Sequence, residues 1–237
     1  MRRVRAVASL IVLMVLPTAA WSQRGGQTAS PPAPAVQAMV AGILLGGRVI
    51  AAGVPLTSGR WGTDYITVSH ALGVGATYAV IRDGLPYVET TPVAACSNRA
   101  HGIDVLILRA PTHVAASVVE WRDPSELRAG DELTAYVRRE IHPTPVTLKF
   151  LHVNLLEWAR VGPETWPSQW HNTMVAEGMA KPGFSGSPWV ARGSVYGLFK
   201  GQVRLPNRDQ WYPVAETAVR VKQCLQQLGY EHLVPAE

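Results

Sequence analysis

The sequence predicts an all-β domain built as two antiparallel barrels and followed by a C-terminal α-helix. The apolar residues lie in short runs rich in β-branched side chains, and turn residues such as Gly46-Gly47 and Asp83-Gly84 separate the runs. Helical periodicity occurs in one segment near the C-terminus. About a dozen strands of this kind fit two barrels better than one sandwich, although periodicity does not distinguish the two architectures.

The predicted strands begin near residue 41 and continue to residue 199. Each is short and apolar, as expected of strands buried on at least one face. The runs are 41–45, 49–54, 65–68, 78–81, 105–108, 133–137, 146–151, 174–176, 189–191 and 195–199. The helix is predicted over 215–228, where Val221, Leu225 and Leu228 lie on an apolar stripe and Gly229 provides the stop.

Residues 1–22 have the composition of a secretory signal peptide. Arg2, Arg3 and Arg5 precede an uncharged apolar stretch, which ends in small residues at positions 20 and 22. An uncleaved membrane anchor is the alternative interpretation of the same stretch. With cleavage, the pattern predicts an exported protein, either periplasmic or secreted.

The rest of the chain divides into a leader and one domain. The segment 23–36 is rich in Gly, Ser and Pro, which predicts a flexible leader. The domain then covers 37–231, with the first barrel over about 37–125, the second over about 126–213, and the predicted helix after them.

The charge balance argues against a nucleic-acid-binding protein. The 237 residues carry 22 Lys+Arg and 17 Asp+Glu, a net charge of +5. Without residues 1–22 the chain keeps 19 basic and 17 acidic residues, too small a surplus for an electrostatic footprint on nucleic acid. A charged fraction of 16% and eight tryptophans exclude a mainly disordered chain. No apolar run reaches the roughly 20 residues of a membrane span, so we expect no stable membrane insertion after signal cleavage.

Cys96 and Cys224 are the two cysteines of the chain. Export would allow them to form a disulfide, whereas two unpaired buried thiols are the alternative, because the sequence does not show whether they are close. Metal binding is not expected. The chain lacks CxxC and HExxH motifs, and its seven histidines show no pairing at ligand spacing.

The segment Gly183-Phe184-Ser185-Gly186-Ser187-Pro188 is the most informative for chemistry. A serine between glycines lies where the backbone turns tightly and approaches other groups closely, which leaves the hydroxyl accessible. The N–H groups of Gly183 and Ser185 could converge there as an oxyanion hole. A Gly/Ser/Pro hairpin loop is the alternative interpretation.

A hydroxyl nucleophile needs a base, and the base needs an orienting acid. His70 follows the predicted strand 65–68 closely, and Asp104 precedes four apolar residues that predict a buried strand. A carboxylate in that position needs a partner such as an imidazole N–H. Taken singly, His70 is also compatible with a surface or core histidine, and Asp104 with a turn or cap residue.

Together the three motifs resemble those of the trypsin-like (chymotrypsin-fold) serine peptidases, especially the bacterial HtrA-like and glutamyl-endopeptidase-like branches. The matching segments are ITVSH at 66–70, IDVLIL at 103–108 and GFSGSP at 183–188, in the family's order of His, Asp and Ser. The resemblance implies two six-stranded barrels with a site between them and a protein or peptide substrate. It implies no metal and no organic cofactor.

The resemblance also implies a role for each residue. Ser185 would attack the scissile carbonyl, and His70 would pass the serine proton to the leaving amine. Asp104 would hold His70 in the right tautomer, and the Gly183 and Ser185 amides would bind the oxyanion.

Two features concern activation and specificity. Phe184 stands where the digestive and clotting members of the family carry an Asp that pairs with a newly cut N-terminus, so that route of activation is not expected. The segments expected to shape the primary pocket contain Met179, Tyr196, Gly197 and Leu198, which favours an uncharged or apolar P1 residue.

The sequence therefore predicts an exported serine endopeptidase that works through an acyl-enzyme intermediate. Two alternatives stay open at this point. One is a catalytically silent protein of the same fold that binds partners, which Phe184 favours mildly. The other is an esterase that uses the same three residues.

Overall fold

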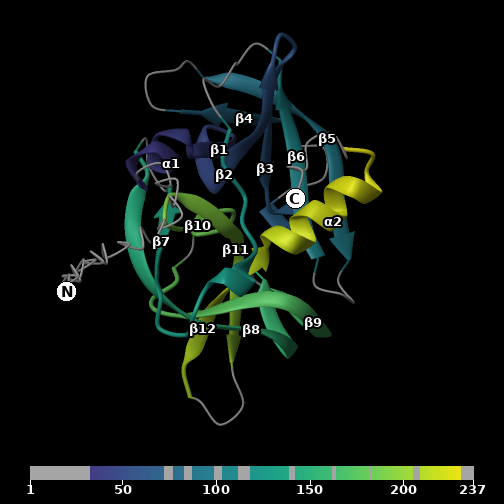
Figure 1. The fold of residues 1–237 in the computed structure, drawn as a ribbon. Helices are drawn as coiled ribbons and strands as arrows, with labels where there is room; N and C mark the ends of the chain where they lie inside the picture. Colours follow the sequence, from purple (N-terminus) through teal and green to yellow (C-terminus); the bar gives the residue numbers. More distant parts are fainter. Residues whose placement is uncertain are drawn as a thin grey trace, which may run out of the picture.

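A computed structural model of the chain describes residues 33–71, 77–82, 87–98, 103–111, 118–138, 142–161, 164–181, 183–204 and 209–230. The predicted signal peptide, most of the predicted leader and residue 231 lie outside these ranges. The described strands form two closed antiparallel barrels of six strands each, and a helix follows them at the C-terminal end, as predicted (Figure 1).

The first barrel contains the N-terminal strands in the order β1-β2-β3-β6-β5-β4. All of its paired strands run antiparallel. Side chains such as Ile43, Tyr65 and Leu108 fill its interior. The strands are β1 (Ala41–Leu45), β2 (Arg48–Gly59), β3 (Gly62–Thr67), β4 (Tyr78–Ile81), β5 (Val88–Asn98) and β6 (Ile103–Ala110).

The second barrel contains the C-terminal strands in the order β10-β11-β12-β9-β8-β7. Leu133, Phe150 and Trp189 are among the side chains that fill it. A short 3-10 helix, η3 (Pro124–Glu126), precedes it. The strands are β7 (Glu132–Val137), β8 (Thr144–Val161), β9 (Glu164–Glu177), β10 (Pro188–Ala191), β11 (Ser194–Arg204) and β12 (Trp211–Thr217).

A third apolar core joins the two barrels. Val54 of the first barrel and Leu198 of the second meet in it, together with Val221 and Leu225 of α2 (Ala218–Gln227). Figure 1 shows α2, in yellow, lying across the junction of the barrels. The barrels are therefore docked by packing as well as by the chain that connects them, which is what a site between them requires.

The N-terminal boundary differs from the predicted one. Residues 33–39 form helix α1 (Ala33–Met39), whereas the leader was expected to extend to residue 36. Val36 is only 1% exposed and belongs to the core between the barrels. Arg138 of the second barrel donates a hydrogen bond to the Val40 carbonyl at 2.7 Å, which holds the chain just after α1. The segment packs despite its linker-like composition because the side chains of Val36 and Met39, and of Val40 after them, reach this core.

Helix α2 begins at Ala218 rather than at residue 215, and the second barrel correspondingly extends past residue 213. Ala215 still pairs with Phe199 of β11, so it belongs to the sheet. The Thr217 hydroxyl accepts a hydrogen bond from the Arg220 N–H at 3.2 Å and caps the helix. Of the helices in the described residues, none is long and apolar enough to cross a membrane.

Candidate active site

Ser185 lies in the tight loop between β9 and β10, and both barrels hold this loop. The Ser185 carbonyl accepts a hydrogen bond from the Ala52 N–H of the first barrel at 2.7 Å, and the Gly186 N–H donates to the Phe199 carbonyl of β11 at 2.9 Å. Gly186 has a φ of +73°, and a Cβ there would lie 2.0 Å from the Ala52 carbonyl oxygen. Glycine is therefore required next to the serine, for its conformation and for the space it leaves.

His70 lies in η1 (Ser69–Ala71), a short 3-10 turn that comes directly after β3. Its Nε2 atom is 2.9 Å from the Ser185 hydroxyl oxygen. Its side chain is 13% exposed, so the ring is partly accessible from solvent. At this distance the imidazole accepts the hydroxyl hydrogen when its proton is on Nδ1.

Asp104 sets that tautomer. It lies near the start of β6 and is fully buried, and its Oδ2 is 2.5 Å from His70 Nδ1. Its Oδ1 accepts hydrogen bonds from the His70 N–H at 2.9 Å and from the Ser69 hydroxyl at 2.6 Å. Burial by itself would raise the pKa of Asp104, but the hydrogen bonds and charge of His70, with the bond from Ser69, outweigh burial and lower this pKa. The carboxylate is thus ionised and presents one oxygen to the ring.

The structure brings the three residues predicted from separate motifs into one hydrogen-bonded chain. His70 and Asp104 come from the first barrel, and Ser185 comes from the second. A hydroxyl bonded to an oriented imidazole can act as a nucleophile, because the ring can take its proton as the oxygen attacks. Ser69 was not predicted. The sequence feature that could have indicated Ser69 is its hydroxyl group in the position directly before His70.

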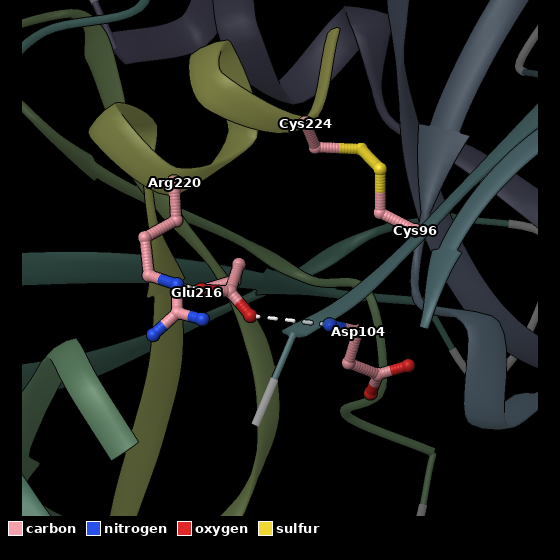
Figure 2. Close-up of a disulfide and its surroundings, with 5 residues drawn as sticks. All are labelled: Cys96, Asp104, Glu216, Arg220 and Cys224. Carbon is pink, nitrogen blue, oxygen red and sulfur yellow. Dashed lines mark hydrogen bonds and ion pairs between the residues drawn. A yellow bond between two sulfur atoms is a disulfide. The ribbon is translucent and has the colours of Figure 1, made fainter. Parts of the chain in front are cut away.

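A group of buried charged residues lies next to Asp104 and was also not predicted. The Asp104 N–H donates to Oε2 of Glu216 at 3.3 Å, and Lys200 Nζ lies 3.1 Å from the same oxygen. Arg220 of α2 forms an ion pair with Oε1 of Glu216 at 3.2 Å (Figure 2). The available signal was the position of Lys200 directly after the apolar run 195–199.

Cys96 and Cys224 form a disulfide, the first of the two alternatives left open by the sequence. It links β5 of the first barrel to α2, across 128 residues of chain, with a Cα–Cα distance of 6.0 Å. Cys96 pairs with Val105 of β6, the neighbour of Asp104. Figure 2 shows this bond and the contact between Asp104 and Glu216 in the same region.

The predicted oxyanion-hole residues lie in the loop that carries Ser185. Gly183 has a φ of +91°, a conformation that favours glycine. The Phe184 N–H donates to the Lys181 carbonyl at 3.2 Å, which closes a turn just before the serine. Residue 182 lies outside the described residues, so the oxyanion hole formed by Gly183 and Ser185 stays a prediction.

The structure does not bring the four predicted substrate-binding residues to one cavity. Met179 is 63% exposed and lines a largely apolar cavity of about 260 Å³ together with Phe184. Tyr196 is buried in the core of the second barrel, and Leu198 is buried in the core between the barrels. Gly197 lies against β12, where a Cβ would meet the Glu216 carbonyl oxygen at 2.6 Å.

Phe184 is a packing residue. Its side chain is buried and meets the Phe199 ring edge to face, with ring centroids 5.8 Å apart. An apolar contact thus lies under the serine loop at position 184. The contact ties this loop to β11, the strand that also receives the Gly186 hydrogen bond.

Comparisons of the sequence with protein-family models and with curated proteins give no match. Solved structures do match. An inactive form of Rv3671c from Mycobacterium tuberculosis, carrying a serine-to-alanine mutation, aligns with a TM-score of 0.63 and 18% identity over 88% of this chain and 94% of that one. Another inactive form of the Rv3671c protease gives a TM-score of 0.61 and 19% identity, over 85% and 98% of the two chains.

The apo protease domain of MamO from Magnetospirillum magneticum aligns with a TM-score of 0.58 and 16% identity, over 84% of this chain and 97% of that one. At these identities the likeness concerns the fold. The placement among HtrA-like or glutamyl-endopeptidase-like branches is not confirmed and stays a prediction. The two closed barrels, their strand order and these neighbours together give the chain the trypsin-like fold.

Proposed function

We propose that this protein is a serine endopeptidase that hydrolyses peptide bonds through Ser185, His70 and Asp104. The observation that carries the proposal is the continuous hydrogen-bonded chain from the serine hydroxyl through both ring nitrogens to a buried carboxylate. Solved neighbours of the same fold are named proteases, which supports a proteolytic activity here.

The acylation half-reaction follows from this arrangement. As Ser185 Oγ bonds to the scissile carbonyl carbon, its proton moves to Nε2 of His70. The Gly183 and Ser185 amides bind the resulting oxyanion. The carbon–nitrogen bond then breaks, and the proton on Nε2 goes to the leaving amine. An ester between Ser185 and the acyl half of the substrate remains.

Water completes the cycle by the same route. His70 accepts a proton from water as the water oxygen attacks the ester carbonyl, and the ester carbon–oxygen bond breaks. The proton then returns to Ser185, which regenerates the hydroxyl. Asp104 stays ionised throughout and stabilises the imidazolium that forms twice in the cycle. The depressed pKa of Asp104, held down by the bonds from His70 and Ser69, fits this role.

We further propose that the protein acts after export. The N-terminal 22 residues have the pattern of a signal peptide, and a disulfide joins Cys96 to Cys224. Disulfides form and persist in oxidising compartments such as the periplasm or the extracellular medium. An apolar P1 residue is part of the proposal, because Met179 and Phe184 line an apolar cavity next to the serine loop.

The test is covalent labelling of the purified full-length chain by a fluorophosphonate probe, with Ser185→Ala as the control. We expect labelling of the wild type and none of the variant, with matched circular dichroism spectra. Wild-type protein that is folded but unlabelled would support the catalytically silent alternative. Unlabelled protein from the same preparation is then assayed with blocked peptides and with matched esters, and turnover of esters alone would make the protein an esterase.

A further inference from the structure

Two fully buried charges lie near Asp104, on the side of its backbone N–H. Lys200 Nζ and Glu216 Oε2 are 3.1 Å apart, and both side chains are 0% exposed. A β-bulge brings the lysine to this position. Phe199 pairs with Ala215 and Gly201 pairs with Val214, so Lys200 is the extra residue of β11.

Glu216 connects this pair to Asp104 and to α2. Its Oε2 accepts the Asp104 N–H at 3.3 Å, and its Oε1 lies 3.2 Å from Arg220 Nε (Figure 2). The hydrogen bond acts on the backbone of Asp104 rather than on the carboxylate. It therefore holds the start of β6, from which the Asp104 side chain reaches His70.

The charges in this cluster balance one another. Asp104 and Glu216 carry two buried carboxylates, and Lys200 and Arg220 place two cationic side chains beside Glu216. Burial lowers the pKa of Lys200, and the attraction of Glu216 opposes this effect.

The charged and polar groups near Glu216 come from four described elements. β11 contributes Lys200, α2 contributes Arg220, and β6 contributes Asp104. β9 contributes the uncharged Thr173, whose hydroxyl oxygen is 2.9 Å from Lys200 Nζ. At the Asp104 carboxylate, η1 contributes His70 and Ser69.

We propose that Lys200 and Glu216 are positioning residues for the catalytic acid. Glu216 fixes the backbone of Asp104, and the pair of charges sets the electrostatic potential at the Asp104–His70 pair. This inference rests on the proposed peptidase function. Stability alone does not account for the arrangement, because apolar replacements of buried ion pairs are often neutral or stabilising.

A charge series tests the proposal. Lys200→Met removes a positive charge and favours the imidazolium form of His70, so the midpoint of the acidic limb of the fluorophosphonate labelling rate should rise. Glu216→Gln keeps an oxygen acceptor for the Asp104 N–H but removes a negative charge, so the same midpoint should fall. Each shift should be about 0.5 to 1 pH unit, the size expected for the loss of one neighbouring buried charge.

The double variant Lys200→Met/Glu216→Gln restores the net charge of the cluster, so its midpoint should return to within about 0.3 pH unit of the wild type. A merely structural role would slow labelling without this opposite movement of the midpoints. The matched controls are Arg204→Met and Asp209→Asn. They make the same changes in charge in an exposed pair at the end of β11, and should leave the midpoint unchanged.

Another variant can be used if Lys200→Met does not fold. Arg220→Gln removes one positive charge from the edge of the same cluster and should raise the midpoint in the direction expected for Lys200→Met. All midpoints are also measured by NMR titration of the His70 ring in histidine-labelled protein, with His70→Asn for assignment. This second measurement does not require a reactive serine.

The outcomes separate the two proposals. If the wild type reacts with the probe and no variant moves either midpoint, the positioning role is wrong and the peptidase proposal stands. If the wild type does not react but the NMR midpoints move in opposite directions, the electrostatic role of Lys200 and Glu216 stands and the peptidase proposal is wrong.

Discussion

Ser69 and His70 donate to the same oxygen of Asp104. The Ser69 hydroxyl is 2.6 Å from Oδ1 and the His70 backbone N–H is 2.9 Å from it, which leaves Oδ2 for the imidazole. Two neighbouring residues thus fix both the rotation of the carboxylate and the place of the ring it serves.

Loss of the Ser69 hydroxyl should slow the reaction of Ser185. A hydrogen bond to a charged group contributes about 1.5 to 3 kcal/mol, so Ser69→Ala should reduce the fluorophosphonate labelling rate at least about tenfold. Ser58→Ala is the matched control, since Ser58 bonds to Thr63 in the β2–β3 hairpin rather than to Asp104. Equal labelling rates for the two variants would contradict the role given to Ser69.

Acid should destabilise the protein partly through Asp104. Because the bonds from His70 and Ser69 hold the pKa of Asp104 below its ordinary value of 3.8, the ionised carboxylate stabilises the folded state above about pH 4. This contribution is lost as the pH falls through the lower pKa of the folded state. Urea unfolding from pH 5 to pH 2 should therefore show a steeper loss of stability for the wild type than for Asp104→Asn. Parallel curves would show that Asp104 contributes nothing to acid stability.

Removal of the disulfide should lower the free energy of unfolding by about 5 kcal/mol in the chain-entropy model, because the bond closes a very long loop. The variant Cys96→Ser/Cys224→Ser tests this by urea unfolding at pH 7, against untreated and reduced wild type. The reduced wild type should unfold at the same urea concentration as the double variant. A change under about 1 kcal/mol in both would mean that packing of α2 alone holds the barrels together.

Gly186 should not tolerate a side chain. Its φ is +73°, and a Cβ would meet the Ala52 carbonyl oxygen at 2.0 Å and the Thr67 hydroxyl at 2.5 Å. Gly186→Ala should cost about 3 kcal/mol or more and should abolish labelling of Ser185. Gly130→Ala is the control, because Gly130 has a φ of +93° but open space around it, and should cost only about 1 kcal/mol. A milder effect at Gly186 than at Gly130 would contradict the close approach of the barrels there.

The sequence was sufficient for the parts of the site that are local. His70, Asp104 and Ser185 each stand in a short motif at the end or start of a strand, and their order indicated the fold in which they meet. Apolar runs and turn residues are also local signals, and they located ten of the twelve strands in the described residues. They missed β5 and β12, and they covered only part of β8 and β9. The start of the domain was not predictable, because Val36 and Met39 of α1 pack in the core between the barrels although the segment before them has the composition of a linker.

Two of the residues predicted to bind substrate, Tyr196 and Leu198, are buried in β11, where bulges interrupt the alternation of the strand. In β11, Trp189 pairs with Gly197 while Val190 pairs with Val195, so Tyr196 is an extra residue and turns into the second barrel. Leu198 then faces the core between the barrels. The same kind of interruption places Lys200 next to Glu216. A period of two, read from the sequence alone, does not reveal where such an extra residue is inserted.

The bond between Cys96 and Cys224 has a consequence for chain integrity. The described chain between these two residues includes the exposed segment 128–130 before β7, and exposed loops are the usual targets of proteolytic nicking. A single nick within that stretch leaves two fragments that are still one covalent molecule. His70 is then carried by the N-terminal fragment, and Ser185 remains tethered to it whenever the cut precedes the serine. A nicked molecule migrates as one band without reductant and as two bands with it, so self-cleavage of this protein would go unseen on a non-reducing gel.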